Sequence, residues 1–283
     1  MWSESQLEVL DYVRLTRKVG RSGLPSRLLS MWNGDYLFLV RKLILKDFKT
    51  RYRNMSLGVL WSLLNPIVMM TVLTFIFTKV FRNPQPNFPV WVLCGLLPFN
   101  FFSIAWSSGT NSVIENVGLV KRVPVPRLVI PISSVLACCL HLLIQIALLL
   151  AMVFAFGLGA NVHWLWLPVV LSLEVIFVLG LSLITAGLNV FVRDTRYVVE
   201  SLNTVLFWLV PTFYSLTAVP QQYLEIYQLN PLAALAVSLR NILLEGRAPA
   251  VSLLTKMALV SFASLAVGWF AFNKFKTRFY NYL

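Results

Sequence analysis

The chain has 283 residues, of which 58% are hydrophobic and only 12% are charged. A soluble domain carries about 25% charged residues, so this chain has too few of them to cover a water-soluble globule, and we interpret it as an integral membrane protein. Its net charge of +13 then indicates basic cytoplasmic loops rather than binding to nucleic acid.

The region 1–56 precedes the first long apolar run and is expected in the cytoplasm. Within it, residues 35–56 are predicted to form an amphipathic helix in the membrane interface. Its predicted apolar stripe consists of Leu37, Val40, Ile44, Phe48 and Met55. Its predicted cationic stripe, which would contact headgroups or a partner, consists of Lys42, Lys46, Lys49 and Arg53.

The region 57–283 is predicted to be an all-α transmembrane domain, because a helix needs about 20 apolar residues to cross the hydrocarbon core. We expect six spans, at about residues 57–80, 88–112, 128–156, 165–191, 198–219 and 249–272. Lys and Arg are concentrated before the first span, after the second, fourth and sixth spans, and much less in the other loops. The positive-inside rule therefore predicts that both termini are cytoplasmic.

A further short helix is predicted between spans five and six. Asn230 is a suitable N-cap, Pro231 suits the first helical position, and Gly246 suits the left-handed position after the last turn. A helix of about 14 residues is too short to cross the membrane, so we expect it to be interfacial or re-entrant. With the aromatic residues of span five it would form an outer gate.

Motifs for catalysis and for energy conversion are missing from the sequence. It contains no Gly-Lys dipeptide for a phosphate-binding loop, no HExxH, no pair of catalytic carboxylates and no metal-ligand cluster. Glu174 is the only convincing acidic residue inside a span, which disfavours an ion-coupled carrier. We predict that the chain is not an enzyme, that it holds no cofactor or metal, and that another protein supplies its energy.

Four stretches, in order and within residues 40–280, resemble the membrane subunit of type-2 ABC exporters. They begin with DFKTRYRNMS, CGLLPFNFFS, LNVFVRDTRY and LNPLAALAVS, and they cover Asp47–Pro66, Cys94–Pro131, Leu188–Pro220 and Leu229–Pro249. The strongest resemblance is to the branch that exports O-antigen, capsule and teichoic-acid polymers. Phe99 stands where members of this family often have Trp.

The resemblance implies a homodimeric permease in a bacterial inner membrane, bound to two copies of an ATPase subunit that holds ATP and magnesium. Its implied cargo is a lipid-linked polysaccharide, and membrane lipid is the other expected partner. Two alternatives stay open, namely a type-2 ABC permease for a small lipid or drug, and a membrane enzyme that acts on lipid-linked sugars. The lack of a catalytic constellation disfavours the enzyme.

The loop between spans two and three is the predicted contact with the ATPase. Ser112 and Glu115 have the spacing of a capping box, which predicts a short helix over residues 113–120, and the resemblance implies that this loop docks on the ATPase. The coupling residues expected here are Glu115, Val117, Leu119, Val120, Lys121 and Arg122. A second candidate contact, after span four, consists of Arg193, Asp194 and Arg196. The alternative for both segments is a solvated loop.

Aromatic residues of spans two and five are candidates for lining a passage, because sugar rings have apolar C–H faces that stack on aromatic rings. The alternative is packing between helices or against lipid. The candidates are Phe99, Phe102, Trp106, Phe207, Trp208, Phe213 and Tyr214.

Polar residues inside the spans suggest two further interactions. Glu174 and Lys256 have opposite charge and similar expected depth, so we predict an ion pair within or between subunits, since an unpaired charge there is costly. The alternative is that Lys256 reaches the interface alone. One face of span three is predicted to hydrogen-bond to neighbouring helices, and the alternative is that it lines the passage; it carries Ser134, Cys138, His141 and Gln145.

Overall fold

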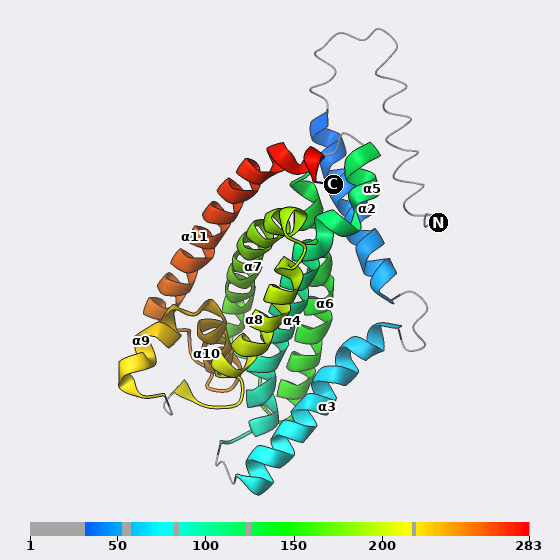
Figure 1. Cartoon of the computed structure of the whole chain (residues 1–283). Coiled ribbons are helices and arrows are strands. Elements are labelled where there is room, and N and C mark those ends of the chain that lie inside the picture. Colours follow the sequence, from blue (N-terminus) through cyan, green and yellow to red (C-terminus); the bar gives the residue numbers. More distant parts are fainter. Residues whose placement is uncertain (1–31, 53–57, 82–84, 123–125, 217–218, 283) are drawn as a thin grey trace.

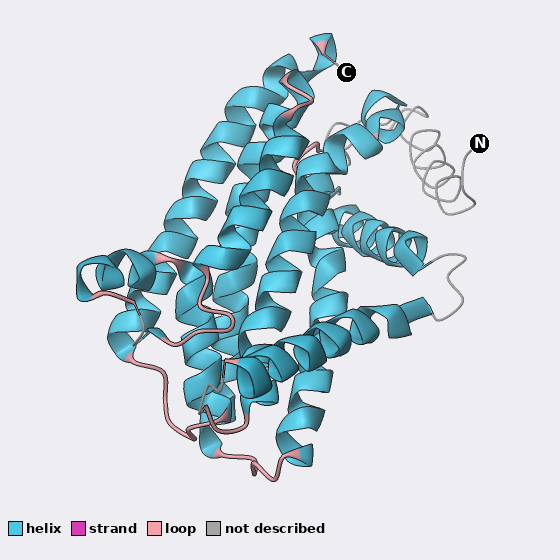
Figure 2. Ribbon diagram, turned by 60° about the horizontal axis from the view of Figure 1, so that its bottom comes forward, coloured by secondary structure: helices cyan, strands magenta, loops and turns pink. Residues whose placement is uncertain are grey.

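A computed structural model of the chain describes residues 32–52, 58–81, 85–122, 126–216 and 219–282. Within these ranges the chain is helical and has no strand (Figure 1 and Figure 2), which confirms the predicted all-α class. Among the described residues, five helical segments are long and apolar enough to cross a membrane: Trp61–Val80, Phe88–Glu115, Val129–Ala155, Val162–Phe191 and Val251–Phe279.

The α-helices are α2 (Trp32–Tyr52), α3 (Trp61–Phe75), α4 (Phe88–Glu115), α5 (Val117–Arg122), α6 (Val129–Ala155), α7 (Leu167–Phe191), α8 (Thr195–Leu209), α9 (Gln221–Leu229), α10 (Pro231–Leu243) and α11 (Val251–Phe275). The π-helical turn η3 (Ile76–Val80) continues α3, and the 3-10 helices η2 (Gly58–Leu60), η4 (Val162–Trp166) and η6 (Lys276–Asn281) flank α3, α7 and α11. In Figure 1, α5 and the C-terminus lie at one end of the bundle, and α9 and α10 lie toward the other.

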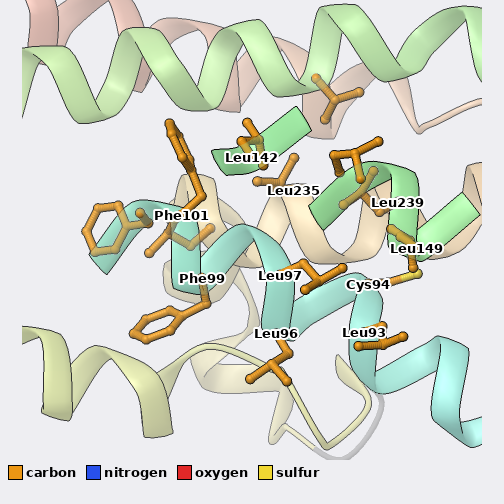
Figure 3. Close-up of a cluster of buried hydrophobic side chains, with 14 of the residues drawn as sticks. Leu93, Cys94, Leu96, Leu97, Phe99, Phe101, Leu142, Leu149, Leu235 and Leu239 are labelled. Atoms are coloured by element: carbon orange, nitrogen blue, oxygen red, sulfur yellow. The ribbon is translucent and has the colours of Figure 1, made fainter. Parts of the chain in front are cut away.

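Helix α4 is the centre of the bundle. It contacts α3, α6, α7, α8 and α10, and nearly all of its side chains from Phe88 to Phe102 are buried. Figure 3 shows Leu93 and Leu97 of α4 gathered with Leu142 of α6 and Leu235 of α10. A helix that is apolar on all sides is stable only when other helices surround it, which explains the central place of α4.

Helices α7 and α11 run parallel and touch through small residues. A Cβ atom added to Gly180 would lie 2.3 Å from the backbone carbon of Ser264, and one added to Gly268 would lie 2.2 Å from the Gly180 oxygen. Further along both helices, Gly187 meets the ring of Phe275. Glycine allows backbones to approach this closely. Because residue numbers rise in the same direction along both helices at these contacts, α7 and α11 are parallel.

The fifth predicted span, residues 198–219, is not a single helix. Helix α8 has 15 residues and ends at Leu209, because the proline ring of Pro211 restricts the preceding residue to an extended conformation. Val210 accordingly has φ −76° and ψ 135°. Residues 211–215 are not helical, and a separate helix that the sequence does not predict, α9, begins at Gln221. The count of six continuous spans is therefore not confirmed.

Candidate functional site

The seven aromatic residues predicted to line a passage belong to one cluster of touching rings. From α4 to α8, the ring centroids of Phe99 and Phe207 lie 5.3 Å apart, and Phe213 lies 5.9 Å from Phe207. Phe102, Trp208 and Tyr214 contact these three rings, and Trp106 contacts Phe102.

Burial differs across this aromatic cluster. Phe102 is completely buried, and Phe99 and Trp106 are each 5% exposed, whereas Trp208 is 64% exposed. Within one chain, the α4 members therefore pack helices together, as the alternative interpretation expects, and Trp208 of α8 presents its ring outward.

Helix α10 begins and ends as the sequence predicts. The Asn230 side chain accepts a hydrogen bond of 3.0 Å from the Leu232 backbone N–H, and Gly246 has φ +61°. Almost every residue of α10 is buried, so the helix lies inside the protein. Asn161, in the turn before η4, donates a hydrogen bond of 2.9 Å to the Ile242 carbonyl and ties that turn to the last turn of α10.

Arg240 of α10 is a buried charged residue in the segment between the fifth and sixth predicted spans. It is 6% exposed, and it donates hydrogen bonds to the carbonyl oxygens of Pro211 and Thr212 at 2.7 and 2.9 Å. Burial lowers the pKa of its guanidinium to about 10, which leaves it charged at neutral pH. The available signal was a single arginine within an otherwise apolar helix.

The predicted coupling helix begins at Val117, later than the residue 113 that the spacing of Ser112 and Glu115 suggested. Helix α4 continues to Glu115, and α5 starts at Val117 after a break at Asn116. No capping box forms, because the Ser112 hydroxyl donates to the Gly109 carbonyl at 2.6 Å within α4. Asn116 is buried, and its backbone carbonyl accepts the first hydrogen bonds of α5.

The side chains of α5 divide between the bundle and its surface. Leu119 is 8% exposed, and Val120 packs against a cluster that includes Val190 of α7 and Phe279 of η6. Both side chains therefore contribute to packing within this chain, and their role in docking the ATPase stays a prediction. Lys121 is exposed, and the side chain of Arg122 lies outside the described residues.

The second candidate contact lies at the same end of the bundle as α5. Arg193, Asp194 and Arg196 are exposed in the α7–α8 turn, directly after the cluster that joins Val190 to Val113 of α4. Arg196 donates to the Tyr197 hydroxyl at 2.6 Å. Because Val120 of α5 packs against the cluster that contains Val190, α5 and the start of α8 lie at the same end of the bundle.

Helix α2 forms on the predicted segment but turns a different face inward. Leu39 and Leu43 are buried against the rest of the chain, whereas Leu37 of the predicted apolar stripe is 78% exposed, and contact of this stripe with the membrane stays a prediction. Lys46 is also turned inward, and its Nζ lies 2.6 Å from Oδ1 of Asn116. Lys46 points inward because Asn116, at the end of α4, supplies it with a polar partner. Helical periodicity alone does not reveal such a partner.

The other expected cations of α2 remain at its surface or outside the description. Lys49 is exposed, and Lys42 Nζ lies 5.5 Å above the Phe38 ring. Arg53 and Met55 lie outside the described residues.

The polar face of α6 holds α2, which confirms its predicted role. Ser134 donates to Asp47 Oδ2 at 3.1 Å, and the His141 ring nitrogen Nδ1 lies 2.7 Å from the Tyr52 hydroxyl. Cys138 between them accepts from Arg51 at 3.4 Å. Gln145, farther along the same face, leaves its Oε1 atom without a partner among the described atoms.

Glu174 and Lys256 do not pair within this chain. Lys256 Nζ donates to Oε1 of Gln228 in α9 at 2.8 Å, and both carboxyl oxygens of Glu174 are buried without a hydrogen-bond partner among the described residues. Within one chain, α9 instead supplies an amide at the level of Lys256, and a pair of Glu174 and Lys256 between subunits stays a prediction.

Comparison with known proteins identifies the family. The family model of ABC-2 type transporters matches residues 39–244. The O-antigen export system permease protein RfbA of Klebsiella pneumoniae is 33% identical over 88% of this chain and 96% of its own length. The RfbA protein of Myxococcus xanthus is 33% identical over 86% of this chain and 94% of its own length. The polysialic acid transport protein KpsM of Escherichia coli is 28% identical over 81% of this chain and 90% of its own. This multi-pass membrane chain therefore belongs to the ABC-2 type transporters, as a transport subunit rather than an enzyme.

Proposed function

We propose that this chain is the permease subunit of an ATP-driven exporter that moves a lipid-linked polysaccharide across a bacterial inner membrane. One observation carries the proposal, namely 33% identity over nearly the whole length of permeases named for O-antigen export. The similarity to a polysialic acid transport protein supports polysaccharide as the cargo class. ATP and magnesium would be bound by a separate ATPase subunit.

In the proposed topology, the chain crosses the membrane six times and both termini are cytoplasmic. The parallel contacts of α7 and α11 support this, because the chain between them has to return to the side where α11 begins. Helix α8 and the chain that follows it would supply the return. The distribution of Lys and Arg supports the orientation.

The proposed assembly is a homodimer with two ATPase subunits. The basic side chains of Lys121, Arg193 and Arg196 would receive the ATPase. Helix α5 would transmit its motion because Val120 packs α5 onto a cluster formed by residues of α4, α7, α11 and η6. The segment 1–56 would form a cytoplasmic region, and residues 57–283 would form the transmembrane domain.

The proposed passage uses the aromatic cluster and ends at an outer gate. The exposed ring of Trp208 and the rings behind it would supply the sliding surface for sugar. The short helix α10 would be re-entrant. A re-entrant segment is tolerated in the membrane where it is buried in protein, as α10 is. The gate would lie between α10 and the segment 210–216.

The test is complementation in a bacterium whose own O-antigen permease gene has been deleted, with this chain expressed together with its ATPase subunit. We expect surface polymer to be restored, and an ATPase variant without hydrolysis to leave the lipid-linked polymer inside. Normal insertion of the complex together with export of a small lipid, and no export of polymer, would contradict the proposal.

A further inference from the structure

Arg240 is a buried cation whose partners are backbone carbonyls. Besides the two hydrogen bonds to Pro211 and Thr212, its Nε donates to the Trp91 carbonyl at 3.3 Å. Its guanidinium carbon lies 3.4 Å from the centroid of the Trp91 ring, a stacking arrangement that favours a cation. Among the described side chains, no carboxylate pairs with it. A buried charge persists only when its hydrogen bonds are satisfied, so these contacts decide where Arg240 is stable.

The carbonyls that Arg240 binds lie in the non-helical segment that follows the end of α8. Away from water, such groups need donors from elsewhere in the protein. The Tyr214 hydroxyl lies within hydrogen-bond distance of the Leu209 carbonyl at 2.8 Å and the Trp208 carbonyl at 3.3 Å, and Arg240 takes the two carbonyls that follow Val210. Tyr214 belongs to the broken segment itself, whereas Arg240 comes from another helix, so the hydrogen bonds of Arg240 join the segment to α10.

The segment 210–214 packs against α4 at a glycine, where the absence of a side chain leaves room for its backbone. A Cβ atom added to Gly95 of α4 would lie 2.9 Å from Thr212 Cα and 3.2 Å from Arg240 Nη2. Thr212 is completely buried against this gap. The next residue, Phe213, places its ring 5.6 Å from Phe77 and within the aromatic cluster. Holding Thr212 against α4 therefore sets the position of Phe213.

We propose that Arg240 is the positioning residue of the outer gate. It holds the segment 210–214 against α4 and thereby keeps Phe213 in the aromatic cluster while the gate is closed. The inference rests on the proposed outer gate between α10 and this segment. A passing polymer requires the segment to leave α4, and this movement breaks the bonds from Arg240 to Pro211 and Thr212. Lysine cannot replace the planar guanidinium, which stacks and donates to several carbonyls at once.

The experiment uses the complex of the permease with its ATPase in lipid nanodiscs. The three native cysteines are first replaced by alanine, at Cys94, Cys138 and Cys139, and Ser215→Cys serves as the reporter. The rate of reaction with a polar maleimide is measured without nucleotide and with magnesium and ATP. The variants are Arg240→Gln, Arg240→Lys and Gly95→Ala. Arg247→Gln is the matched control, because Arg247 is exposed and pairs with Glu245.

We expect Arg240→Gln to raise the nucleotide-free rate about tenfold, because the lost hydrogen bonds come from a charged donor. Arg240→Lys should lie between this variant and the parent, and Arg247→Gln should equal the parent. Gly95→Ala should raise the same rate by pushing Thr212 from α4, which keeps the test decisive if Arg240→Gln fails to insert. The inference would be overturned if Gly95→Ala reacted at the parental nucleotide-free rate and Arg240→Gln, provided that it inserts into the membrane, did so as well. If the rate at the Ser215→Cys reporter in the parent did not change with ATP, the proposed gate would be refuted instead. The nucleotide-free rates of the variants would still decide whether Arg240 positions the segment.

Discussion

Lys46 Nζ donates a hydrogen bond of 2.6 Å to Oδ1 of Asn116, the residue at which α4 ends and α5 begins. The N-terminal helix is thereby fastened to the junction between the central helix and the proposed coupling helix. Asp47 lies 3.4 Å from the same ammonium group and accepts from Ser134 of α6. Three helices therefore meet through polar contacts at the base of α5, and a displacement of α5 would reach α2 as well as α4.

Replacing Lys46 with Met should weaken the connection between ATP hydrolysis and export, because Asn116 loses its partner. We expect export to fall several-fold while the ATPase subunits still copurify. A double-mutant cycle with Asn116→Leu on thermal unfolding should give a coupling energy of about 1 kcal/mol. Lys49→Met is the control, since Lys49 of the same helix is exposed, and an equal loss of export in that variant would contradict the specific role of Lys46.

Leu119→Asp should destabilise the permease itself, because Leu119 is 8% exposed within its own chain. Burial of an unpaired charge at such a site costs several kcal/mol, so the protein recovered in membranes should decrease strongly. Lys121→Ala should change neither recovery nor ATPase binding by much, because an exposed ion pair is worth only about 1 kcal/mol or less. Normal recovery of Leu119→Asp with loss of the ATPase would instead make Leu119 a direct docking residue.

Lys256 and Gln228 should behave as a coupled pair, whereas Lys256 and Glu174 should not. Thermal unfolding in detergent would be measured for Lys256→Met with Gln228→Leu, and for Lys256→Met with Glu174→Gln. We expect an interaction energy in the first cycle and additivity within about 0.5 kcal/mol in the second. A large interaction energy in the second cycle would restore the pair of Glu174 and Lys256, formed between subunits.

Gly268→Ala should loosen the contact of α11 with α7, because the new Cβ would lie 2.2 Å from the Gly180 oxygen. Overpacking of this kind costs about 1–3 kcal/mol, so the unfolding temperature should fall clearly. Gly159→Ala is the matched control, since nothing lies within 4 Å of the added Cβ. If the two variants unfold at the same temperature, α7 and α11 do not approach at these glycines.

Features with a local cause could be predicted from the sequence. Long uncharged runs indicate membrane helices wherever they occur, because the thickness of the hydrocarbon core sets the length. The bounds of α10 followed from Asn230, Pro231 and Gly246, because caps act on the backbone only a few residues away. The four motifs in order gave the family, and its model matches residues 39–244.

Tertiary structure alone decided how the polar residues are used. Lys46 and Arg240 look in sequence like surface cations, yet Asn116 in one case and the carbonyls of Pro211 and Thr212 in the other turn them inward. The partner of Lys256 was hidden for the same reason, since Gln228 lies in a helix that the sequence analysis missed. A buried polar group is stable only where distant segments supply its partners, and periodicity along one helix carries no information about those segments.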